Sequence, residues 1–159
     1  MRTDQIILER WLACLLQDHP GQTVSFLTQA LTQGLTKDKF RNPVGYTLRE
    51  NLAVVLDQLR LAEMDIPTLR TALENIVRIR AVQDLSANQA VAFVFQLKPI
   101  LQELLPADAA SFNNRIEQLA EMASREFTHC REQLAEIRLR ERRRTAGGAL
   151  ALARARRNR

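Results

Sequence analysis

Hydrophobic residues recur every three or four positions along most of the chain, which is the spacing of one face of an α-helix. No segment alternates between apolar and polar residues as a half-buried strand would. The sequence therefore predicts an all-α fold, a single helical bundle with a long C-terminal helix. The predicted helices cover residues 3–18, 24–33, 47–59, 65–80, 87–105 and 108–144.

Capping residues and prolines set the expected helix ends. Ser86 with Gln89, and Thr47 with Glu50, have the form of capping boxes. Residues 34–45 are expected to be a loop, because Asn42-Pro43-Val44-Gly45 favours a turn. Pro99 lies inside an otherwise apolar helix, and we expect it to kink or break that helix near Gln96.

The last helix carries an unbroken heptad of apolar and small residues flanked by charges. From Asp108 to Arg144 it would be roughly 55 Å long at 1.5 Å per residue, longer than a small domain, so its end should project. Two interpretations remain open: the heptad packs onto its own bundle, or it forms a dimer or transmission helix. The heptad residues are Ile116, Ala120, Ala123, Phe127, Cys130, Leu134 and Ile137.

Several charges lie next to the most apolar stretch of the chain, residues 90–95. Arg78, Arg80 and Asp84 precede it, and Glu74 stands four residues before Arg78 in the favourable order for a helical ion pair. Arg78 and Arg80 are two residues apart and cannot share a helix face. We interpret the four as a structural and regulatory ion cluster that pins the turn before the apolar helix. A signal-binding or anion-binding site is the alternative.

Positive charge is concentrated at the C-terminus. Residues 138–159 hold nine arginines and one glutamate, a net charge of +8, whereas residues 1–137 hold 14 Lys and Arg against 17 Asp and Glu, a net charge of −3. We expect a helical domain over residues 1–140 and a tail over 141–159 that is disordered or weakly helical. The tail either solubilises the protein or docks on an acidic protein, an anionic membrane or a nucleic acid. Without aromatic residues it offers no support for sequence-specific nucleic-acid recognition. The docking candidates are Arg138, Arg140, Arg142, Arg143, Arg144, Arg154, Arg156, Arg157 and Arg159.

The remaining chemistry is sparse. Cys14 and Cys130 lack metal-ligand spacing and suit a reducing cytoplasm, where we expect no disulfide. No segment is apolar enough to span a membrane and no secretory signal is present, so we expect a cytoplasmic protein. His19 and His129 lie outside the apolar segment, which argues against haem. Because no nucleophile set, paired carboxylates, metal set or phosphate loop appears, we expect no cofactor and no enzyme activity.

Two segments resemble a known family. FRNPVGYTLREN at residues 40–51 and IVRIRAVQDLSANQAVAFVFQLKPIL at residues 76–101 are similar to the amino-terminal domain of RsbR-type co-antagonists of the RsbT kinase, the stressosome sensor proteins. The resemblance spans roughly residues 5–140. It implies a helical, dimeric sensor domain related to a globin fold that lacks haem. In that family a long helix leads to a phosphorylated STAS output domain; here the arginine-rich tail stands in its place, so we expect a free-standing sensor domain.

The leading hypothesis is a non-catalytic sensory or regulatory domain in signalling, a homodimer that acts on an unknown partner through protein–protein contacts. The alternative is an accessory protein that docks through its basic tail on an anionic membrane or a membrane-bound redox complex. A small-ligand or redox-cofactor binder is the third interpretation.

Overall fold

The computed structural model describes residues 2–17, 40, 43–82 and 85–158, and within these ranges every regular element is a helix. The order is α1 (Arg2–Gln17), α3 (Pro43–Arg60), α4 (Ile66–Ala81), α5 (Ala87–Leu104) and α6 (Ala109–Arg157). The prediction of an all-α bundle with a long last helix is confirmed. The predicted helix over residues 24–33 lies outside the described residues, and the relation to a globin fold stays a prediction.

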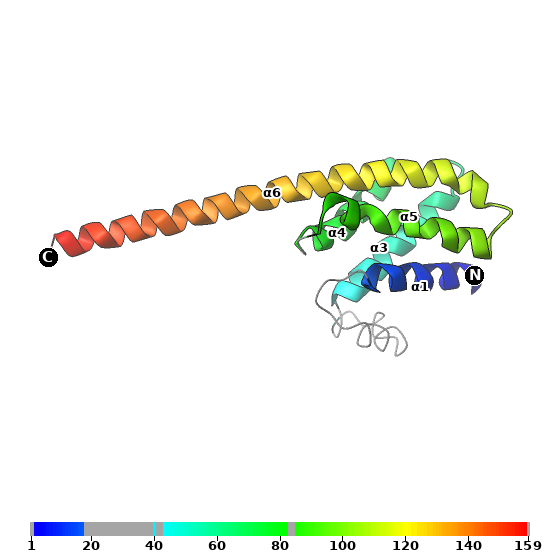
Figure 1. The fold of residues 1–159 in the computed structure, drawn as a ribbon, viewed down its shortest axis with the longest axis horizontal. Coiled ribbons are helices and arrows are strands. Elements are labelled where there is room, and N and C mark those ends of the chain that lie inside the picture. Colours follow the sequence, from blue (N-terminus) through cyan, green and yellow to red (C-terminus); the bar gives the residue numbers. More distant parts are fainter. Residues whose placement is uncertain (1, 18–39, 41–42, 83–84, 159) are drawn as a thin grey trace.

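The helices form one body with α6 along one side of it, and α6 then continues far beyond the body (Figure 1). α4 and α5 both pack on α6, α3 packs on α4, and α1 packs on α3 and α5. All five helices contribute to a single hydrophobic core. No helix in the described part of the chain combines the length and the apolar content needed to cross a bilayer.

Local sequence signals explain where two of the helices begin. Ser86 forms a complete capping box: its hydroxyl accepts from the Gln89 backbone N–H, and the Gln89 side chain accepts from the Ser86 backbone N–H. α4 follows Asp65 with Pro67 in its first turn, where the missing N–H costs nothing. The Asp65 carboxylate accepts a hydrogen bond from the Thr68 hydroxyl at 2.6 Å rather than capping the backbone.

The expected start of α3 is wrong by one turn. α3 begins at Pro43, so the predicted turn through Val44 and Gly45 is already helical. Proline suits this position because the first-turn N–H groups have no partner inside the helix. Thr47 is therefore not the cap, and its hydroxyl donates to the Pro43 carbonyl oxygen at 2.8 Å.

Pro99 does not break α5, which continues to Leu104. A proline removes the hydrogen bond that its N–H would donate to the carbonyl four residues earlier, here that of Phe95. Both Phe95 and Pro99 are exposed on the outer side of α5, so water can hydrate that carbonyl. Of the two expected outcomes near Gln96, the break is therefore wrong, and the kink stays a prediction.

α6 is 49 residues long, about 73 Å at 1.5 Å per residue. It continues through Gly147 and Gly148 to Arg157, although the sequence predicted a disordered or weakly helical tail. Alanine, leucine and arginine, which dominate this part of the chain, are among the strongest helix formers, and they outweigh the roughly 1 kcal/mol that each glycine costs. We call residues 138–157 the projecting segment, because every residue of it is exposed.

Candidate functional site

Arg80 is the one charged residue buried among the described residues, with 2% of its surface exposed. Its Nε donates to the Ala90 carbonyl oxygen at 2.9 Å, and a terminal guanidinium nitrogen donates to the Gln89 carbonyl oxygen, also at 2.9 Å. The guanidinium carbon lies 5.9 Å from the centre of the Phe93 ring, within the range of a cation–π contact. Arg80 therefore holds the end of α4 against the first turn of α5.

Trp11 fixes the same helix from the other side. Its indole N–H donates to the Phe93 carbonyl oxygen at 2.6 Å, and its ring stacks on Phe93 with the centroids 6.2 Å apart. Both rings are fully buried. α5 is thus located by two side chains that bind its backbone, in addition to apolar packing.

Arg131 and Arg115 on α6 make contacts of the same kind. Arg131 donates to the carbonyl oxygens of Ala81, at the end of α4, and Leu85, before α5, at 3.4 and 3.0 Å. Arg115 donates to one carbonyl oxygen in the last turn of α3 and to two just after that helix ends, at 2.5 to 2.9 Å. The last carbonyls of a helix have no partner inside it, so these arginines satisfy groups that would otherwise need water. We call Arg80, Arg115 and Arg131 the arginine clasp.

The predicted ion cluster does not form one group within the described residues. Arg78 pairs with Glu74 one helical turn earlier, on an exposed face of α4, whereas Arg80 points into the core. Asp84 lies outside the described residues. Burial raises the pKa of the nearby Cys130 thiol, and the positive charge of Arg78 partly offsets that rise.

The heptad residues of α6 divide between the core and the solvent. Ile116, Ala120, Ala123, Phe127 and Cys130 are buried within the bundle of their own chain. Leu134 is partly buried against that core, and Ile137 is half exposed. The first five heptad residues therefore pack on the bundle of their own chain, as the first interpretation expected. They could contact a second chain only if that bundle opened.

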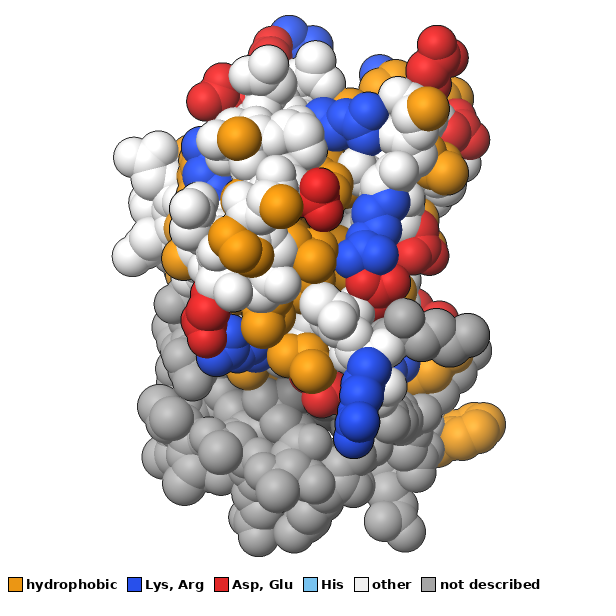
Figure 2. Space-filling model, turned by 90° about the vertical axis from the view of Figure 1, so that its right-hand side faces the viewer, with side chains coloured by type: hydrophobic (Ala, Val, Ile, Leu, Met, Phe, Trp, Pro, Cys, Tyr) orange, Lys and Arg blue, Asp and Glu red, His pale blue; other side chains and the backbone are white. Residues whose placement is uncertain are grey.

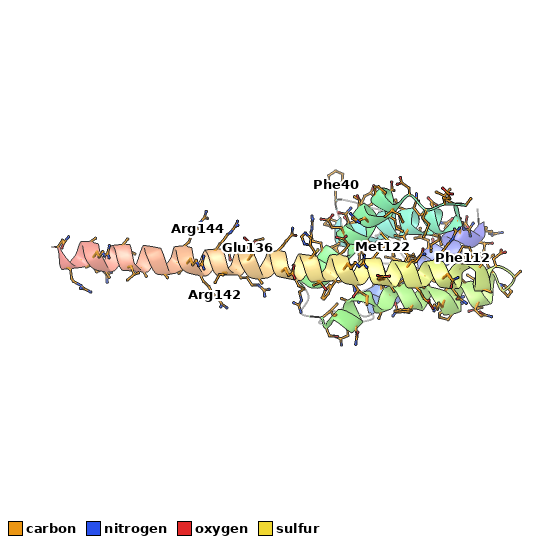
Figure 3. The ribbon with its side chains drawn as sticks, turned by 90° about the horizontal axis from the view of Figure 1, so that it is seen from above. Phe40, Phe112, Met122, Glu136, Arg142 and Arg144 are labelled. Carbon is orange, nitrogen blue, oxygen red and sulfur yellow. The ribbon has the colours of Figure 1, made fainter. Side chains whose placement is uncertain are left out.

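α6 leaves the body after Leu134, which is partly buried against the core. Beyond this point Arg140 pairs with Glu136 at 2.6 Å, and no contact with the other helices supports the projecting segment. Arg142 and Arg144 point to opposite sides of the helix (Figure 3). The docking candidates from Arg138 to Arg157 are all exposed, and Arg159 lies outside the described residues.

Sequence reasoning missed Arg115, and it treated Arg131 only as a flanking charge. Their acceptors are main-chain carbonyls 56 and 46 residues away in the sequence, and any residue type can supply them. The burial of Arg80 was also not predicted, although its place at the end of the predicted helix and just ahead of the most apolar segment was a signal.

The histidines and cysteines considered as ligands do not form a site among the described residues. His129 is exposed and contacts Gln133 at 3.1 Å, while His19 lies outside the described residues. Cys14 and Cys130 are free cysteines. In the part of the chain that the structure describes, no three His, Cys, Asp or Glu residues come together to hold a metal ion.

Comparison with known proteins gives one match. Residues 6–151 fit the family model described as the RsbT co-antagonist protein rsbRD N-terminal domain. The match includes both segments that carry the resemblance in sequence, and it extends past residue 140 into the predicted tail. No curated protein and no solved structure matches the chain.

Proposed function

The chain belongs to the rsbRD N-terminal domain family of RsbT co-antagonist proteins, a family of regulatory sensor domains in stress signalling, and we propose that it acts there as a non-catalytic homodimer with α6 as its output element. The observation that carries the proposal is the place of Arg131. It ties the connection between α4 and α5 to the part of α6 that directly precedes the projecting segment.

This contact gives a physical route for a signal. A change in how α4 and α5 pack would move the carbonyl oxygens of Ala81 and Leu85, which Arg131 holds. Arg131 also lies over the Phe127 ring, with 5.4 Å from its guanidinium carbon to the ring centre, so the movement would reach the buried side of α6. Because α6 is one continuous helix, a small rotation at Arg131 becomes a large displacement at Arg157.

Hydrogen exchange tests this route. In Arg131→Met, the amides of residues 131–137 should exchange faster while those of residues 116–120 keep their protection. Arg125→Met is the matched control, because Arg125 is 76% exposed and pairs only with Glu121 one turn earlier. If both variants leave residues 131–137 equally protected, Arg131 does not couple the α4–α5 connection to α6.

The outer face of α5 supports the homodimer. Residues 90–95 are all apolar, so they cover every side of the helix. Ala90, Phe93 and Val94 are buried in the core, whereas Phe95 is 45% exposed. Pro99 lies one turn further along the same outer side and is exposed. An apolar outer face is stabilised when a second copy covers it.

Analytical ultracentrifugation at micromolar concentration tests the dimer. The unmodified chain should sediment as a dimer, and Phe95→Glu should convert it to a monomer with unchanged helix content. Leu61→Glu is the control, because Leu61 is 47% exposed but lies at the end of α3 and not on α5. A monomeric unmodified chain, or a Phe95→Glu variant that stays dimeric, would overturn this interface.

The alternative of docking on an anionic membrane has less support. A helix that lies on a membrane separates an apolar face from a charged face. Here Arg142 and Arg144 lie on opposite sides of α6 (Figure 3). Leu150 and Leu152 are two residues apart and also point to different sides. No single apolar face is therefore available for insertion.

A further inference from the structure

The projecting segment is a rod of positive charge. It is about 30 Å long and carries eight arginines against a single acid, Glu141. The body has a net charge of −3, and its end opposite the projecting segment shows side chains of both signs among hydrophobic ones (Figure 2). By net charge, the projecting segment is therefore the part of the chain that favours a polyanion.

We propose that the projecting segment binds duplex DNA, independently of base sequence, by lying in the major groove. An α-helix with its side chains is about 10–12 Å across, and the major groove of B-form DNA is about 12 Å wide. In that groove phosphates flank the helix on both sides. Arginines on opposite sides of α6, such as Arg142 and Arg144, would each face a phosphate strand.

The distribution of residues along the segment suits this placement. Arginines form two clusters, at residues 138–144 and 154–157, separated by nine uncharged residues, 145–153. Six of these nine are Gly or Ala, so the middle of the helix can approach the groove floor closely, while each cluster reaches the phosphates. A Cβ added at Gly147 or Gly148 would meet no other atom, so neither glycine is needed for packing within the chain.

The same residues define which nucleic acid is expected. The middle stretch has no Asn, Gln, Arg or Lys to form bidentate hydrogen bonds with base edges, so binding should not depend on sequence. The segment also has no aromatic ring on which unpaired bases could stack. Duplex binding is therefore favoured over single-strand binding.

Pairing of two projecting segments with each other is disfavoured. The apolar heptad ends at Ile137, and the next positions at the same spacing are Glu141 and Arg144. Each projecting segment has a net charge of +7, so two segments side by side would repel each other. The charge thus favours a negatively charged partner, and this inference does not depend on the proposed dimer.

Fluorescence anisotropy with a labelled 20-base-pair duplex tests the proposal on the full chain. Binding should weaken steeply with salt, with a slope of log K against log salt of about −6 if about seven phosphates are neutralised. Replacing Arg142, Arg143 and Arg144 by Gln should make the slope shallower by about 2.7 and weaken binding at least about 100-fold at low salt. Replacing the same three by Lys should keep most of the binding, since a lysine also neutralises a phosphate. Two duplexes of unrelated sequence should bind within about threefold of each other.

A helix-breaking variant separates groove binding from charge alone. Ala149→Pro keeps every arginine but interrupts the helix between the two clusters, and it should weaken duplex binding at least tenfold. Ala149→Ser is the control and should bind as the unmodified chain does. Equal binding by the proline variant would overturn the groove geometry.

Three further results would overturn the proposal. One is no duplex binding at micromolar protein in 50 mM salt. Another is stronger binding to vesicles of one third phosphatidylglycerol and two thirds phosphatidylcholine than to the duplex, which would instead support a membrane role. The third is duplex binding that survives deletion of residues 138–159.

Discussion

Replacing Arg80 by Met should destabilise the body by about 3 kcal/mol. The variant loses two hydrogen bonds from a charged donor, each 2.9 Å long and each worth at least about 1.5 kcal/mol. The cation–π contact with Phe93 is lost as well, while the methionine side chain recovers some packing. For a chain of 159 residues, this loss corresponds to a melting temperature about 6–12 °C lower.

Arg78→Met is the matched control, because it makes the same substitution two residues earlier on the same helix. Arg78 is 61% exposed and pairs with Glu74 one turn away, an arrangement worth about 0.3–0.5 kcal/mol. Arg80→Lys is the third variant. It keeps the positive charge but buries an ammonium that cannot reproduce the two parallel bonds of the guanidinium, so it should cost at least as much as Met.

Urea denaturation followed by tryptophan fluorescence measures these differences. Trp11 is the only tryptophan, it is fully buried, and it contacts α5 through Phe93, so its emission reports on the helix that Arg80 holds. The reasoning is refuted if Arg80→Met and Arg78→Met differ by less than about 1 kcal/mol in the free energy of unfolding. A stable Arg80→Lys variant would show that charge rather than hydrogen-bond geometry matters.

Three other measurements examine features of α6. Arg115→Met removes three bonds to carbonyls in the last turn of α3 and just after it, and it should lower the free energy of unfolding by about 2 kcal/mol, read from the urea midpoint. Because burial raises the pKa of Cys130, its thiol ionises first in the unfolded chain, so stability should fall as pH rises above about 8.5. Cys130→Ala should show a smaller fall between pH 7 and 10; an equal fall would contradict that shift. Replacing Gly147 and Gly148 by Ala should stabilise the projecting segment by about 1 kcal/mol per residue, seen as slower amide exchange at residues 140–155. The urea midpoint of the body should stay unchanged, because neither new Cβ contacts another atom.

Local signals account for the features that the sequence predicted well. The start of α5 follows from Ser86 and Gln89, which satisfy each other's backbone groups whatever the rest of the chain does. The start of α3 was misplaced because proline both stops helices and begins them, and only the surrounding structure decides between the two. For the tail the sequence left disorder and a weak helix open, because its charge and its glycines suggested disorder whereas its other residues favour a helix.

The candidate site depends on contacts that no local pattern contains. Arg78 and Arg80 were correctly expected to point in different directions, because residues two apart cannot share a helix face. Which of them would be buried depends on how α4 meets α5, and the spacing of residues does not specify this. The partners of Arg115 and Arg131 lie on other helices, so they become visible only when the helices are packed.

The acceptors described above for the arginine clasp are main-chain carbonyls, and this has a consequence for how the protein tolerates substitution. Leu61 and Ala62 each supply an oxygen that every amino acid possesses, so their side chains are not needed for these contacts. A library of all single substitutions should therefore be asymmetric, with Arg80, Arg115 and Arg131 intolerant and Leu61 and Ala62 much more permissive. Two members of this family could then keep the same clasp while sharing little sequence around its acceptors.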